Sequence, residues 1–247
     1  MNFETTVILC RPESSMNIGA VCRVMANTGV SDLRIICPEN GDKRNYNEDD
    51  VLRLALNADY IWKNAKFFPH SSESVAIAGA DCSALAGTTR RIGQKRKNCG
   101  ETPEELCSNL ERFYGGRLGL VFGNERTGLT DKELAQCTFS VNIPADEKFG
   151  SYNLSHAVLI LTYSIFAGKK NISPKGLIKP KASLQKIRST AQEICTHLAD
   201  LGMFKTGGRL ENEDFFTKLL SSAGASDFEV EHLAGIFKKV HFLKNNN

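Results

Sequence analysis

Short apolar runs rich in β-branched residues alternate with helical patterns through the first two thirds of the chain. This alternation predicts a parallel β-sheet with helices on its faces, because two parallel strands need a crossover between them. Residues 74–87 are ambiguous by periodicity, and we interpret them as a short helix to about Ala80 followed by a strand near 83–86. We expect five strands, at residues 5–10, 33–37, 83–86, 118–122 and 139–143. The sequence therefore predicts an α/β fold.

Two helix starts are marked by their capping residues. Thr102 is followed by Pro103 and Glu105, which combines an N-cap, a first-turn proline and a capping-box glutamate. Thr130 and Glu133 repeat the pattern. Each threonine hydroxyl can accept a hydrogen bond from a first-turn amide that has no partner inside the helix, so both threonines should begin helices.

The character of the sequence changes after Phe166, where residues 167–181 are rich in Gly, Lys, Pro and Asn. We expect an α/β domain at residues 1–168, a linker at 169–182 and a small all-α extension at 183–247. A first helix would bury an apolar stripe made of Leu184, Ile187, Ala191, Ile194, Leu198 and Leu201. A shorter helix is expected at 213–220, and a last one after Ser226 would bury Val230, Leu233, Phe237 and Val240. Because three short helices make too small a core, they should pack on the main domain or on another subunit.

The composition limits the class of protein. With 247 residues and 41% apolar content, the chain can bury a sizeable core. It has neither a run of about 18 apolar residues nor the pattern of a signal peptide, so we expect a cytoplasmic protein with no membrane segment. The eight cysteines include no C-x-x-C pair, and no histidines cluster beside them in the sequence. Buried reduced thiols and no bound metal are expected.

The net charge of +3 neither demands nor excludes a polyanionic partner. Its distribution is more informative, because two runs of basic residues stand out. Taken alone, such a run is more often a solvated surface than a nucleic-acid site. The first run consists of Arg90, Arg91, Lys95, Arg96 and Lys97, and the second of Lys169, Lys170, Lys175, Lys179, Lys181, Lys186 and Arg188.

Three polar segments follow expected strands, at the edge where open α/β sheets bind ligands. In the first, Asn17 and Arg23 lie about 240° apart around a helix, so a helix cap plus a surface arginine explains them without any function. The second carries Gly123, Glu125 and a further glycine, and it fits neither the dinucleotide fingerprint nor the P-loop pattern. A ligand loop and a tight turn are both open there.

The third segment is a long loop over residues 143–156 that precedes an apolar helix. Ser151, Asn153 and Ser155 are reasonable helix caps, and capping alone could account for them. A loop of this length at a sheet edge is also typical of a binding loop. His156 receives no role, because a lone histidine in a first helical turn is more often structural.

In this order, the three segments resemble the signature motifs of the SPOUT superfamily, specifically the TrmH family and its TrmJ-like tRNA 2′-O-ribose methyltransferases. The resemblance covers about residues 5–166 and rests on Asn17-x-Gly-x-x-x-Arg23, on residues 122–130 and on 143–155. It implies a SPOUT fold with a C-terminal trefoil knot, S-adenosyl-L-methionine as cofactor, no required metal, and a homodimer with shared active sites.

The resemblance also implies roles for individual residues. Arg23 of one subunit would lie against the cofactor loops of the other. Because a guanidinium resists deprotonation, we expect Arg23 to position the substrate rather than act as the base. Its companions at the catalytic site would be Asn17, Glu125, Ser151 and Asn153. RNA would be bound by Arg23, Arg90, Arg91 and Lys95. The cofactor would be held by Thr88, Thr89, Arg90, Gly123, Glu125, Ile143, Ser151, Tyr152, Asn153 and Leu154.

The function implied by the resemblance is 2′-O-methylation of ribose in RNA, with a cytidine or uridine of the tRNA anticodon loop as the expected target. Two alternatives on the same fold are an rRNA 2′-O-methyltransferase and a non-catalytic RNA-binding SPOUT protein. A nucleotide-dependent oxidoreductase is a rival of another class. The absence of a glycine fingerprint after the first strand counts against it.

Overall fold

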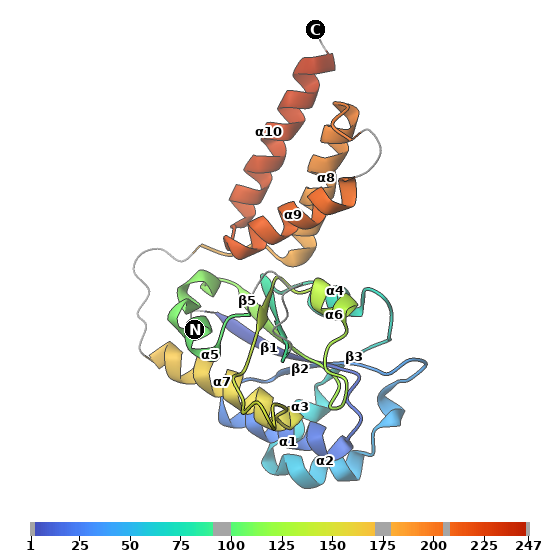
Figure 1. Cartoon of the computed structure of the whole chain (residues 1–247), viewed down its shortest axis with the longest axis vertical. Coiled ribbons are helices and arrows are strands. Elements are labelled where there is room, and N and C mark those ends of the chain that lie inside the picture. The colour runs from blue at the N-terminus through green and yellow to red at the C-terminus, as the bar shows by residue number, and fades with distance from the viewer. Residues whose placement is uncertain (1–2, 91–99, 171–178, 205–207, 246–247) are drawn as a thin grey trace.

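A single six-stranded sheet, all of it parallel, forms the centre of the protein in the computed structural model (Figure 1). The structure describes residues 3–90, 100–170, 179–204 and 208–245. The strand order is β3-β2-β1-β5-β4-β6. The strands are β1 (Glu4–Cys10), β2 (Asp32–Ile36), β3 (Lys66–Phe68), β4 (Ala84–Thr88), β5 (Arg117–Phe122) and β6 (Phe139–Val141). The predicted α/β fold is confirmed, with β3 as an additional strand.

Helices cover both faces of the sheet because side chains along each strand point alternately to the two sides. On β1, Val7 and Leu9 belong to the larger core cluster, and Ile8 and Cys10 belong to the smaller one. The larger cluster lies under α1 (Ser15–Asn27), α2 (Glu48–Ala55), α3 (Asp59–Lys63), α5 (Pro103–Ser108) and α7 (Leu154–Lys170). The smaller cluster includes Val75 and Ala78 of α4 (Ser74–Ala78) and Cys137, which follows α6 (Asp131–Ala135). Short 3₁₀ turns occupy Lys43–Asn45, Leu56–Ala58 and Leu110–Phe113.

Both predicted capping boxes are present. The Thr102 hydroxyl accepts a hydrogen bond from the Glu105 amide at 3.2 Å, and the Glu105 carboxylate accepts one from the Thr102 amide at 2.8 Å. Thr130 and Glu133 make the same pair at the start of α6. Local sequence therefore determines where these two helices begin.

The C-terminal region consists of α8 (Leu184–Asp200), α9 (Arg209–Ser222) and α10 (Asp227–Asn245), which project from one end of the sheet (Figure 1). It has a small core of its own, made of Ala182, Ile187, Leu220, Ala225 and Val230. The first turn of α8 is anchored to the main domain. Leu184 is part of the smaller core cluster, and its amide donates to the Cys82 carbonyl at 2.7 Å.

Several predicted boundaries differ from the structure. The helix expected at 213–220 begins earlier, at Arg209, and Val240 is exposed rather than buried on the apolar face of α10. The helix before the linker continues to Lys170, because the Lys169 ammonium donates to the Phe3 carbonyl and lies 3.8 Å from the centroid of the Phe3 ring. Most of the predicted linker lies outside the described residues.

The seven cysteines that the structure describes are free thiols, and all but Cys107 are buried. Burial raises the pKa of Cys22, Cys82 and Cys137 to about 12, so these thiols stay protonated and unreactive near neutral pH. Cys99 lies outside the described residues. Within the described ranges, no helix combines the length and the apolar character needed to cross a membrane.

The second basic run is only partly a free surface. The Arg188 guanidinium donates to the carbonyls of Ala76 and Gln136, which ties α8 to the main domain. Lys186 pairs with Asp227 and Glu231 of α10. These two side chains are therefore engaged in packing α8 and are not available to a polyanion.

Candidate active site

A cleft of about 320 Å³ opens at the carboxyl ends of β4, β5 and β6, beside the first turn of α7. Its walls combine backbone, small polar groups and apolar side chains such as Phe122, Val141 and Ala157. Ligands bind open α/β sheets outside the carboxyl ends of the strands, which is where this cleft lies.

Gly123 closes the end of β5 against the loop that follows. A Cβ atom added at Gly123 would lie 2.0 Å from the carbonyl carbon of Gly128 and 2.1 Å from the amide nitrogen of Leu129. Gly128 itself adopts a φ of 68°, a conformation that a side chain would strain. The two glycines therefore allow the backbone to fold into a tight loop at the floor of the cleft.

Asn124 holds this loop in shape from inside. Its Oδ1 atom accepts hydrogen bonds from the amides of Arg126 at 3.0 Å and Thr127 at 3.1 Å. Its Nδ2 atom donates to the Arg11 carbonyl at 2.9 Å and to the Glu13 carboxylate at 3.0 Å. The buried asparagine thus connects the loop after β5 to the loop after β1.

A second link between these loops is the ion pair of Arg11 with Glu133. The Arg11 Nε atom lies 2.8 Å from Glu133 Oε1, with side-chain exposures of 18% and 11%, and Arg11 also donates to the Gly128 carbonyl. Burial acts to raise the pKa of the Glu133 carboxyl, but hydrogen bonds from Arg11 and Thr130 outweigh it and hold the pKa below its usual value. Arg11 adopts a φ of 55°, which is uncommon for an arginine and aims its side chain into this contact.

The three polar segments of the sequence meet through side-chain hydrogen bonds. Glu125 accepts from the Asn17 side chain at 3.1 Å and from the amides of Glu13 and Ser14 at 2.9 and 3.2 Å. Asn17 in turn accepts from the Asn153 side chain at 3.0 Å. Asn153 also accepts from the Ser155 amide at 2.9 Å, so it caps α7 as well. The continuous chain Glu125, Asn17 and Asn153 therefore joins residues far apart in sequence at the rim of the cleft.

The structure places the predicted cofactor residues together: all but Asn153 line the cleft. Asn153 is linked to the cleft-lining Glu125 by two hydrogen bonds, through Asn17. Arg90 lines the cleft, whereas Arg91 and Lys95 lie outside the described residues. Arg23 is exposed on α1 and does not line the cleft, and its side chain makes no hydrogen bond or ion pair with any residue that the structure describes. Within one chain, the structure does not bring Arg23 to the cleft.

Sequence reasoning missed the residues that support the cleft from behind. Asn124 stands inside the predicted loop next to Gly123, and an asparagine in a turn directly after a strand is a signal that could have been noticed. The pairing of Arg11 with Glu133 has no local signal, because it joins loops that only the fold brings together.

A comparison with known families places this chain. Residues 4–163 match the SpoU rRNA Methylase family, which is more than half of the sequence. The chain belongs to this family. The family resemblance carried by the three segments is thereby confirmed, and it covers the sheet, the cleft and most of α7.

Two relatives have closely similar sequences over the same part of the chain. The tRNA (cytidine-2′-O-)-methyltransferase TrmJ of Methanocaldococcus jannaschii is 37% identical over 164 residues, which cover 66% of this chain and 68% of that protein. The tRNA (cytidine/uridine/adenosine-2′-O-)-methyltransferase TrmJ of Pseudomonas aeruginosa is 36% identical over 162 residues, covering 64% and 59%. Both alignments leave a substantial part of each protein unmatched.

The similarity of folds extends further than the similarity of sequences. The crystal structure of TrmJ from Z. mobilis ZM4 superposes with a TM-score of 0.71 at 27% identity, and covers 96% of this chain and 98% of that one. The C-terminal helices are therefore included in the match. The expectation of a helical extension of the TrmJ type agrees with this likeness.

Proposed function

We propose that this protein transfers a methyl group from S-adenosyl-L-methionine to a ribose 2′-hydroxyl of tRNA, with an anticodon-loop cytidine or uridine as the target. The observation that carries the proposal is the hydrogen-bonded chain Glu125, Asn17 and Asn153 beside the cleft, in a member of the SpoU family. The choice of tRNA is supported by relatives that are named tRNA 2′-O-methyltransferases.

The cleft fits S-adenosylmethionine in size and chemistry. Its volume of about 320 Å³ lies within the range of small-molecule sites. Apolar walls from Phe122, Val141 and Leu154 suit an adenine ring, and the exposed backbone beside Gly123 and Ile143 offers hydrogen-bonding groups for its edge. Thr88, Thr89, Arg90, Glu125, Ser151 and Tyr152 complete the set of groups that would hold the cofactor. We infer that the segment after β5 forms the trefoil knot around this cleft.

When bound, S-adenosylmethionine supplies an electrophilic methyl group on a sulfonium centre. The chain's own contribution is to place the ribose hydroxyl in line with that group. Glu125 fixes the Asn17 side chain, and Asn17 fixes Asn153, so the rim of the cleft is rigid before RNA arrives. Ser151 is exposed at the mouth of the cleft and is available to contact the ribose. We propose, as the sequence led us to expect, that this methyl transfer requires no metal ion.

We infer further that the active unit is a homodimer in which Arg23 completes the partner's site. Arg23 has no partner among the described residues of its own chain and does not reach its own cleft. The neighbouring helix α7 exposes Leu159 and Tyr163, which are 38% and 58% exposed. Apolar surface on the two packed helices α1 and α7 is suited to pairing with a second copy. A guanidinium from that copy would bind a phosphate and orient the ribose.

Mixed dimers test the shared site. Arg23→Ala removes the arginine, and Ser151→Phe fills the cleft from an exposed position that does not disturb the core. Each variant alone should be inactive. Co-expression should restore about a quarter of the wild-type rate, because half of the dimers then hold one intact site of two. No recovery in verified mixed dimers would show that Arg23 acts within its own chain, and full activity of Arg23→Ala alone would show that it has no role.

Labelled methyl transfer to total RNA, followed by size fractionation and nucleoside analysis, tests the reaction and the substrate together. We expect a 2′-O-methylated nucleoside in the tRNA fraction. The same product in the rRNA fraction would support 2′-O-methyl transfer but show that rRNA, not tRNA, is the substrate. Binding of S-adenosylmethionine without transfer to any RNA would indicate a non-catalytic RNA-binding protein. The buried, free cysteines fit a reducing compartment, and we propose that the reaction takes place in the cytoplasm.

A further inference from the structure

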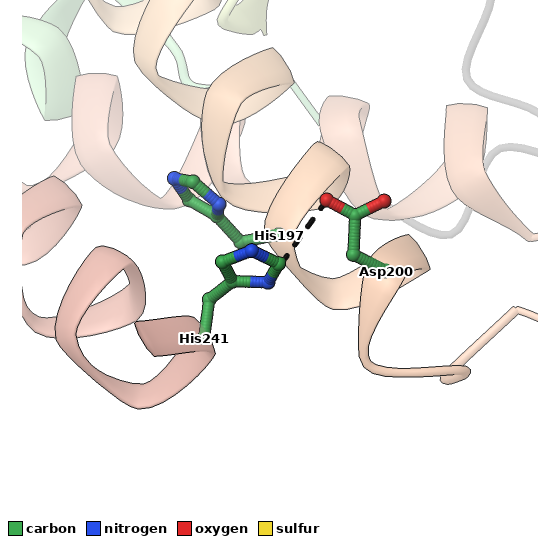
Figure 2. A group of neighbouring side chains, drawn as sticks. All are labelled: His197, Asp200 and His241. Carbon is green, nitrogen blue, oxygen red and sulfur yellow. Dashed lines mark ion pairs between the residues drawn. The ribbon is translucent and has the colours of Figure 1, made fainter. Parts of the chain in front are cut away.

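Two histidines and an aspartate come together in the C-terminal helices, away from the cleft. His197 and Asp200 lie in the last turn of α8, and His241 lies near the end of α10. Figure 2 shows the two imidazole rings one above the other, with the Asp200 carboxylate beside His241. One ligand atom from each residue lies within 4.8 Å of the other two. His241 Nδ1 is 3.9 Å from Asp200 Oδ2, and the ring centroids are 5.1 Å apart.

The ring nitrogens of His197 are the main indication of a bound ligand. Its side chain is only 17% exposed, and both ring nitrogens are buried without a hydrogen bond to any residue that the structure describes. A buried polar group without a hydrogen bond is destabilising, so native proteins seldom leave one. The nearest acidic group is the Glu193 carboxylate, at 3.7 Å from Nε2. An ion held by a ring nitrogen would satisfy His197.

We propose that His197, His241 and Asp200 bind a divalent transition-metal ion of the zinc type. Imidazole nitrogen and carboxylate oxygen are ligands that Zn²⁺ accepts, with bonds of about 2.0–2.2 Å. Tetrahedral ligands at that distance lie about 3.3 Å apart, so ligand atoms now within 4.8 Å of one another must approach by at most about 1.5 Å. Asp200 is exposed and can make this movement. Glu193 stands next to His197, where it serves as the fourth ligand or orients the imidazole.

The ion would join the end of α8 to α10. These helices are otherwise held together by a core of few buried residues, to which neither His197 nor His241 belongs. A metal that binds only the folded arrangement stabilises it by its binding free energy. The site therefore has a structural role, and the cleft contains none of its ligands. Histidines far apart in sequence explain why no metal set was expected before the fold was known.

The test uses the full-length protein stripped of metal by a chelator and titrated with Zn²⁺ and with Co²⁺. We expect one equivalent to bind and to raise the melting temperature. The Co²⁺ complex should show the visible bands of a nitrogen and oxygen site, without the thiolate charge-transfer band that cysteine ligands give. His197→Gln and His241→Gln should each weaken binding about tenfold or more. His232→Gln is the matched control, because His232 is exposed on the same helix and stacks on Phe228.

Three results would overturn the proposal. They are the absence of stoichiometric binding to the wild-type protein, equal binding by all variants, and a thiolate band in the Co²⁺ spectrum. The readouts need neither S-adenosylmethionine nor RNA, so failure of the proposed methyl transfer leaves this test intact. Circular dichroism of each variant separates loss of a ligand from loss of the fold.

Discussion

Changing the hydrogen bond between Asn17 and Glu125 is the most direct test of whether the ordered rim of the cleft contributes to catalysis. Asn17 donates to the Glu125 carboxylate at 3.1 Å and accepts from the Asn153 side chain at 3.0 Å. Asn17→Ala removes both bonds, whereas Asn17→Asp keeps the acceptor for Asn153 but sets a second carboxylate against Glu125. Both variants leave the lining of the cleft unchanged.

The magnitudes follow from these contacts. A hydrogen bond to a charged group is worth about 1.5–3 kcal/mol and a neutral one about 0.5–1.5 kcal/mol. Because Asn17 is half-buried, we take the lower ends, about 2 kcal/mol for Asn17→Ala. If the two hydrogen bonds of Asn17 stabilise only the transition state, the loss of about 2 kcal/mol lowers kcat by about 30-fold. Asn17→Asp loses the charged bond and adds repulsion between like charges, so it should be slower than Asn17→Ala although it is the closer isostere.

The assay is methyl transfer to a saturating tRNA, with kcat and the KM for S-adenosylmethionine measured separately. We expect kcat to fall and this KM to stay within about threefold. The double variant Asn17→Asp with Glu125→Gln restores a donor opposite an acceptor and should recover part of the loss. Asn109→Ala, which breaks only an exposed bond to the Glu105 carbonyl, is the control. A kcat for Asn17→Asp equal to that of the wild type would refute the reasoning.

Three further outcomes are expected. Arg23→Ala should abolish methylation while the melting temperature and the Kd for S-adenosylmethionine, measured by calorimetry, stay unchanged; full activity would remove its role. Gly123→Ala should lower the melting temperature and prevent S-adenosylmethionine binding, because its Cβ meets Gly128 at 2.0 Å; normal binding would contradict the packing argument. Glu133→Gln replaces the charged hydrogen bonds from Arg11 by neutral ones and should cost about 2 kcal/mol in urea unfolding at pH 7. The pKa of the Glu133 carboxyl is lower in the folded than in the unfolded protein, so its contribution to folding stability is present above the unfolded pKa and is lost as pH falls through the folded pKa. The variant lacks this carboxyl and should therefore lose less stability on acidification than the wild type.

Features coded by short stretches of sequence were predictable here. The capping boxes at Thr102 and Thr130 and the parallel sheet follow from local hydrogen bonding and from the alternation of elements. Strand β3 was missed because it has only three residues, is half-buried at the sheet edge, and lacks the length of an apolar run. Val240 was wrongly assigned to a buried face: it is 47% exposed, whereas its neighbour His241 is the side chain of that turn that lies against α8.

The candidate site divides in the same way. Residues that would touch the cofactor stand in three continuous loops, so a motif could bring Gly123, Ser151 and Leu154 to attention. Arg11 and Glu133 act behind the cleft through a pair that no spacing in the sequence encodes. Likewise, His197 and His241 become neighbours only when α10 folds back along α8. Contacts between distant segments depend on the fold, so pattern alone cannot supply them.

The place of the C-terminal helices leads to a prediction about substrate size. The first turn of α8 is anchored at the Cys82 carbonyl, beside the amino ends of β4 and β5. The cleft lies at the opposite, carboxyl ends of these two strands. Strands of five and six residues separate the two by about 17–20 Å. An RNA that touches both must span at least that distance, so a folded tRNA can use α10 and a short oligonucleotide cannot. Replacing the exposed Lys238 and Lys239 by serine should therefore raise the KM for tRNA and leave the KM for an oligonucleotide with the same target unchanged. Equal effects on both substrates would show that these lysines do not contact the distal part of the RNA.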